Sequence, residues 1–64
     1  MKIKDLPKGT YFTLTATPFP KESQVYIRGE YDRSERKYEC TKFSDIGSSR
    51  LFRGDKEVYV NFIF

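Results

Sequence analysis

The sequence of 64 residues contains no histidine, no tryptophan and a single cysteine. Without histidine the chain lacks the side chain that most readily acts as a general base near neutral pH. No serine or cysteine has a recognisable paired base, and no glycine-rich phosphate loop is present. One cysteine without histidine gives no zinc-ligand pattern. We therefore predict no catalytic residues, no metal site and no cofactor, and a role in binding rather than as an enzyme.

Long apolar segments are also missing. The N-terminal residues, MKIKDLPKGT, carry lysines but no apolar stretch of the kind that forms a signal peptide. No apolar run elsewhere approaches membrane-spanning length. One cysteine cannot form an internal disulfide, so no oxidising compartment is indicated. The sequence thus predicts one cytoplasmic domain over residues 1–64, with no membrane partner.

The excess of positive charge is small and unevenly placed. Twelve basic and nine acidic residues give a net charge of +3. All of this excess lies in residues 1–21, where four lysines stand against Asp5 alone. Because the rest of the chain is balanced, basicity is weak evidence for a nucleic-acid partner.

The pattern of the chain is that of short strands. No segment of helix length has helical periodicity, and the sequence has eleven aromatic residues, five Tyr and six Phe. We expect strands at 10–17, 24–31, 37–43, 49–53 and 56–64, and alternation in the first places Phe12, Leu14 and Ala16 toward the core. Five strands with short connections predict an all-β fold, a small and strongly bent antiparallel barrel. In strand count and loop spacing this layout resembles SH3-like small barrels.

The central prediction is a long hairpin over residues 24–43, QVYIRGEYDRSERKYECTKF, with a polar tip at 32–36. Keeping apolar residues on one face pairs Tyr31 with Tyr38, Gly29 with Cys40, Arg28 with Thr41 and Tyr26 with Phe43. Cys40 is then buried, whereas Tyr26 and Arg28 face outward. Gly29 in mid-strand indicates a kink, a bulge or a close approach of another segment.

The connections and the last hairpin complete the expected core. Phe19, held between two prolines, either covers the core or stands exposed as an anchor for a partner, and burial is favoured. Ile46, in the connector 44–48, is expected to fill the core. A turn at Gly54-Asp55 pairs the last two strands, with Leu51, Val58, Val60 and Phe62 inside and Phe52 outside.

Three segments carry a resemblance to a group of proteins. KDLPKGTYF, VYIRGEYDRSERKYEC and GDKEVYVNF resemble short uncharacterised proteins of gut Bacteroidetes and their mobile elements. The resemblance covers most of the chain and brings no known activity and no functional residues. It implies a cytoplasmic protein of one domain.

Interleaved aromatic and basic residues suggest a first function, the binding of single-stranded nucleic acid. The candidates lie on the two expected hairpins and are Tyr26, Arg28, Phe43, Arg50, Phe52 and Tyr59. The alternative explanation is structural, because cross-strand aromatic pairs and Arg–Tyr stacking stabilise a sheet face without a ligand. The acidic neighbours Glu30, Glu39 and Glu57 also argue against a polyanion.

A second function is a protein-interaction module, in which an aromatic groove or an exposed edge strand receives a peptide. A second copy of the chain is an equally open partner, which would make a homo-oligomer. The candidate contacts are Tyr11, Phe19, Ile63 and Phe64. The interleaving on two separate hairpins places nucleic acid first and another protein second.

Overall fold

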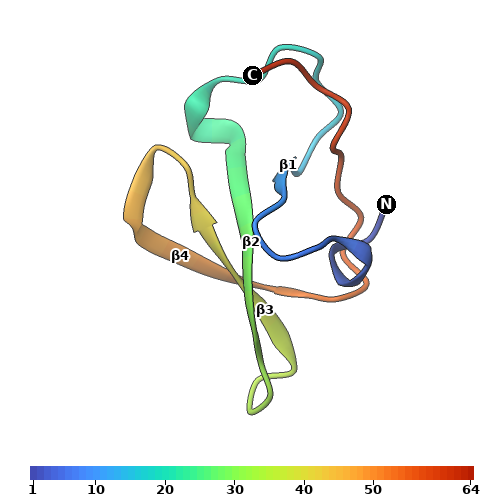
Figure 1. Cartoon of the computed structure of the whole chain (residues 1–64), viewed down its shortest axis with the longest axis vertical. Helices are drawn as coiled ribbons and strands as arrows, with labels where there is room; N and C mark the ends of the chain where they lie inside the picture. The colour runs from blue at the N-terminus through green and yellow to red at the C-terminus, as the bar shows by residue number, and fades with distance from the viewer.

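The computed structural model describes residues 1–64 and shows an all-β protein with one antiparallel sheet (Figure 1). The strands follow chain order, β1-β2-β3-β4. The elements are the 3₁₀ turn η1 (Ile3–Asp5), β1 (Tyr11–Thr13), the 3₁₀ turn η2 (Glu22–Gln24), β2 (Val25–Asp32), β3 (Lys37–Lys42) and β4 (Asp45–Arg53). The sheet is open, so the structure does not show the predicted closed barrel of five strands.

The central hairpin is confirmed as β2 and β3, and its tip is held by one side chain. The Asp32 carboxylate accepts hydrogen bonds from the Ser34 amide at 2.9 Å, the Ser34 hydroxyl at 2.6 Å and the Glu35 amide at 3.2 Å. This is the turn that Asp commonly makes with the backbone that follows it. Arg36 completes the reversal with a left-handed φ of 57°.

The predicted register of this hairpin is confirmed at its tip but is wrong at its base, because β2 contains a bulge. Tyr31 pairs with Tyr38 as predicted, but Arg28 rather than Gly29 pairs with Cys40. Between these pairs β2 has one residue more than β3, and a one-residue shift exchanges the two faces of a strand. Tyr26 therefore pairs with Lys42 instead of Phe43 and turns inward.

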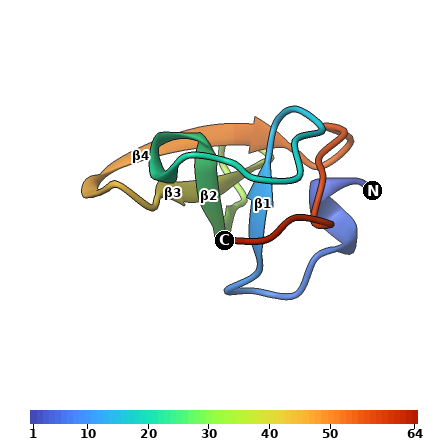
Figure 2. The ribbon, with the colours of Figure 1, turned by 90° about the horizontal axis from the view of Figure 1, so that it is seen from above.

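The predicted last hairpin is wrong. Strand β4 pairs with β3, from Lys37 opposite Arg53 to Thr41 opposite Ser49, and not with the residues that follow it. Beyond β4 the chain crosses to the N-terminal segment and to β1, where it forms isolated bridges at Glu57 and Tyr59 (Figure 2). Phe52 then lies opposite Tyr38 and faces the core, whereas Leu51 faces outward.

The core lies on one face of the sheet and is closed by both ends of the chain. Its buried residues are Ile3, Leu6, Phe12, Tyr26, Cys40, Phe52 and Val58. The N-terminal and C-terminal segments are joined by backbone bonds from the Ile3 amide to the Lys56 carbonyl, 3.2 Å, and from the Val58 amide to the Met1 carbonyl, 2.7 Å. The predicted burial of Phe12, Cys40 and Val58 is confirmed.

Two further burial predictions are wrong. Phe19 is 71% exposed instead of covering the core, so its alternative position on the surface is the observed one. Ile46 is also 71% exposed, because β4 already begins at Asp45 and includes most of the expected connector 44–48. Residues 46–48 have no opposite residue on β3, which makes them an outward bulge.

Candidate functional site

The six residues proposed for nucleic-acid binding do not form one surface. Tyr26 and Phe52 are only 6% and 9% exposed, and their rings pack in the core at 5.5 Å in an edge-to-face arrangement. Arg50 lies over them: its Nη1 donates to the Tyr26 hydroxyl at 3.3 Å, and its guanidinium lies 5.4 Å from the Phe52 ring centre. These contacts support the structural explanation for Tyr26, Arg50 and Phe52, because they hold the core face together.

Arg28 is engaged in a similar way on β2. Its guanidinium lies 4.3 Å from the centre of the Tyr38 ring, and its Nη1 donates to the Gly29 carbonyl at 2.8 Å. The Arg28 Nε is buried and has no hydrogen-bond partner. Arg28 is thus held against the bulge and the ring of Tyr38.

Phe43 belongs to a different surface, which we call the aromatic patch and define as Tyr11, Phe43, Phe62 and Phe64. Ring centres lie 5.7 Å apart for Tyr11 and Phe43, 4.7 Å for Phe43 and Phe64, and 6.2 Å for Tyr11 and Phe64. Phe62 lies 6.4 Å from Phe64. None of the four belongs to the core cluster. Side chains alternate along a strand, so Tyr11 and its neighbour Phe12 point to opposite faces, and the patch forms on the side away from the core.

The other two protein-interaction candidates adjoin the aromatic patch. The Ile63 amide donates to the Pro18 carbonyl at 2.9 Å, which ties the C-terminal segment to the loop that carries Phe19. Ile63 and Phe19 are among the most exposed apolar residues of the chain. Tyr11 and Phe64 are therefore in ring contact, and Ile63, which precedes Phe64, is bonded to the residue before Phe19.

Sequence reasoning missed two parts of this surface. Phe43 was assigned to the outer face of the central hairpin, and Phe62 to the inner face of a last strand. The bulge in β2 and the crossing of the C-terminal segment bring both to the aromatic patch. Gly29, in the middle of the predicted strand, indicated the bulge that moves Phe43. Nothing in the local pattern indicated the crossing that moves Phe62.

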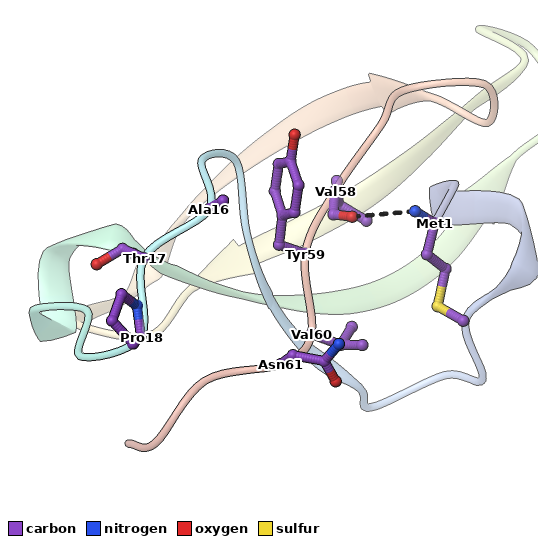
Figure 3. Close-up of a pocket in the computed structure, with 8 residues that line it drawn as sticks. All are labelled: Met1, Ala16, Thr17, Pro18, Val58, Tyr59, Val60 and Asn61. Atoms are coloured by element: carbon purple, nitrogen blue, oxygen red, sulfur yellow. Dashed lines mark hydrogen bonds between the residues drawn. The ribbon is translucent and has the colours of Figure 1, made fainter.

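A groove of about 540 Å³ lies between Met1, residues 16–18 and residues 58–61 of the C-terminal segment (Figure 3). Met1, Ala16, Thr17, Pro18, Val58, Tyr59, Val60 and Asn61 line it. The Met1 ammonium donates to the Val58 carbonyl at 3.3 Å and pairs with Glu57 at 3.0 Å. Tyr59, the remaining nucleic-acid candidate, is exposed at this groove, where it forms a bridge with Thr13.

The titratable groups with altered pKa values lie in the central hairpin, on Glu30, Asp32 and Cys40. A hydrogen bond and ion pair with Lys8 lower the pKa of Glu30. The bonds from Ser34 and Glu35 lower the pKa of Asp32. Burial raises the pKa of the Cys40 thiol, which makes it a poor nucleophile. The register predicted for the central hairpin would also place Glu30 opposite Glu39; the bulge removes that pairing, and Lys8 forms an ion pair with Glu30.

No protein family, no curated protein and no solved structure matches the chain. Nothing therefore bears on the resemblance to short proteins of gut Bacteroidetes, which stays a prediction. The structure contains no helix with the length and apolar character needed to cross a membrane.

Proposed function

We propose that the chain is a small protein-interaction module that binds an apolar segment of a partner protein at the aromatic patch. The observation that carries this proposal is the contact of Tyr11, Phe43 and Phe64 with one another outside the core. The core itself has its own three aromatic rings, Phe12, Tyr26 and Phe52. The aromatic patch is additional to this core cluster, and two of its rings, Tyr11 and Phe64, are exposed.

The chemistry of the patch suits a protein partner. Aromatic residues are enriched where proteins bind one another, and a contiguous exposed apolar area often marks such a site. Phe19 and Ile63 extend the apolar area at the edge of the patch. Rings that already contact one another lose little side-chain freedom on binding, which favours affinity.

Single-stranded nucleic acid is the second candidate, and one observation favours it. Tyr59 is exposed beside the N-terminal segment, where Lys2 forms a bridge with Glu57. The lysines of residues 1–21 supply the whole positive excess of the chain. A base stacked on Tyr59 would therefore lie near the most basic part of the protein. The SH3-like classification of the layout likewise stays a prediction.

Selection of peptides from a random display library tests the first candidate. We expect selected peptides to be rich in apolar residues and to shift the amide signals of Tyr11, Phe43 and Phe64. Phe19→Ser and Phe64→Ser should weaken the binding of a selected peptide by about tenfold each, as truncation at the centre of an interface does. Ile46→Ser is the matched control, because Ile46 is as exposed as Phe19 but lies on the bulge of β4.

The same spectra separate the two candidates. Shifts at the aromatic patch that Phe64→Ser removes and Ile46→Ser retains support a protein partner. Peptides that bind equally well to Phe64→Ser and to the wild type contradict it. Shifts at Tyr59 and Lys2 on addition of a mixed single-stranded oligonucleotide, lost on raising the salt concentration, would favour nucleic acid instead.

A further inference from the structure

The sheet ends in an open edge at β4. Strand β4 is the last in the order β1-β2-β3-β4, and no strand pairs with its outer side. The β1 edge, by contrast, is engaged through the bridge between Thr13 and Tyr59. An open edge presents a row of unpaired amides and carbonyls, and the group that satisfies both is another extended strand.

Only part of this edge is straight enough to accept a strand. Residues 46–48 bulge away from β3, whereas Ser49 to Arg53 pair with it residue by residue. An added strand therefore fits residues 49–53, whose central residue is Leu51. Leu51 is 40% exposed and points to the face away from the core.

We propose that this edge binds the same edge of a second copy of the chain, antiparallel and about a two-fold axis through Leu51. The contact is self-complementary, as a two-fold interface must be. Leu51 lies opposite Leu51 of the second copy, Arg50 opposite Phe52, and Ser49 opposite Arg53. The two sheets become one sheet of eight strands, twice the four of a single chain.

The charges of β4 favour this register over its neighbours. No like charges lie directly opposite one another in it, and opposed like charges are destabilising across strands. A shift of two residues toward Asp45 would place Arg50 opposite Arg50 and would use the bulge. The reverse shift would leave a paired stretch of three residues, 51–53. In the proposed register the two Arg50 side chains are diagonal rather than direct neighbours, and each stays over the Phe52 ring of its own chain.

This inference concerns the β4 edge and does not rest on the function proposed for the aromatic patch. The patch is built from Tyr11 of β1, from Phe43 between β3 and β4 and from the C-terminal Phe62 and Phe64, and it shares no residue with the stretch 49–53 of β4. The dimer would carry two patches, one on each copy. A bivalent display of this kind raises the effective affinity for a partner that carries two binding segments.

Sedimentation equilibrium of charge variants tests the proposal. We expect the wild type to associate to a dimer, and Leu51→Lys to weaken that dimer by about tenfold or more, because two like charges then meet at the two-fold axis. Leu51→Glu should weaken it as well, whereas an equal mixture of Leu51→Lys and Leu51→Glu should restore association. Ile46→Lys is the matched control, since it adds the same charge to the same strand outside the paired residues.

Each outcome decides the proposal. Rescue in the mixture, with Ile46→Lys unchanged from the wild type, supports it. A wild type that stays monomeric up to about 1 mM, a concentration at which even weak specific dimers form, overturns it. A dimer that Leu51→Lys does not weaken also overturns it. Isotope-filtered contacts between two copies at Tyr11 or Phe64, rather than between Leu51 methyl groups, would assign association to the aromatic patch and overturn the β4 dimer.

Discussion

Gly29 lies directly against the backbone carbonyl of Glu39, in the bulge that sets the faces of the whole β2 strand. A methyl group at position 29 would collide with that carbonyl oxygen, which belongs to the neighbouring strand and cannot rotate away. Glycine is thus the residue that permits the bulge, and the bulge is what turns Tyr26 toward the core.

The first prediction follows from this contact. Gly29→Ala should lower the free energy of unfolding by roughly 2 kcal/mol or more, because the backbone of β2 or β3 must move to make room. Gly47→Ala is the control, since a methyl group there would lie no closer than 3.6 Å to the Asp45 carboxylate. Urea denaturation of both variants measures the difference. Equal stability of the two variants would contradict the bulge.

The second prediction separates the observed core from the one that the sequence pattern suggested. Phe52→Ala should cost about 3–5 kcal/mol, the usual cost of removing a buried aromatic ring. Leu51→Ala should change stability by about 0.5 kcal/mol or less, because Leu51 is on the surface. Short domains have small free energies of unfolding, so Phe52→Ala can leave the chain unfolded. Phe52→Leu removes less of the ring and should still lower the free energy of unfolding by more than Leu51→Ala. A larger loss in the free energy of unfolding for Leu51→Ala than for Phe52→Leu would contradict the observed core and favour the predicted last hairpin.

The third prediction concerns acid. Lys8 lowers the pKa of Glu30 below its ordinary value of 4.5 in the folded chain. The contact therefore stabilises the fold above that ordinary value, and this contribution is lost as the pH falls through the lowered pKa. Lys8→Gln should raise the Glu30 midpoint toward 4.5, as carboxyl chemical shifts would record. An unchanged midpoint would show that the ion pair does not persist in solution.

The fourth prediction concerns Cys40. Burial raises the pKa of its thiol above the ordinary 9.0 and hides it from reagents. Alkylation of the folded chain should be slow and should speed up when urea unfolds it. Because the folded chain holds the proton more tightly, the free energy of unfolding does not depend on this thiol below pH 9.0. It falls as the pH rises from 9.0 through the pKa of the folded state. Alkylation at the same rate with and without urea would contradict the burial of Cys40.

The sequence predicted those parts of the fold that depend on local patterns. The central hairpin, its polar tip and the burial of Phe12 and Cys40 are read directly from alternation and turn residues. The prediction fails where a single position decides which side of a strand faces the core or where the chain runs next. The bulge at Gly29 reversed the base of β2, and a turn at Gly54-Asp55 led the chain to the N-terminal segment instead of back along β4.

The candidate residues were predictable as individuals but not as a surface. Tyr11 and Phe64 were both chosen for exposure and aromatic character, and the structure brings their rings together. Their contact depends on a C-terminal segment that crosses β1, a long-range arrangement that no local pattern encodes. The six candidates for nucleic-acid binding do not form one surface, because two of them, Tyr26 and Phe52, are buried in the core.

The salt dependence of binding tests the central claim most directly. The measurement is the affinity of the wild-type chain for a display-selected apolar peptide and for a mixed single-stranded oligonucleotide, each at low and at physiological salt. A protein-interaction module predicts that the peptide binds with nearly the same affinity at both salt concentrations and that Phe64→Ser weakens it. Binding of the oligonucleotide alone, with an affinity that falls steeply as salt rises, would contradict the proposed function.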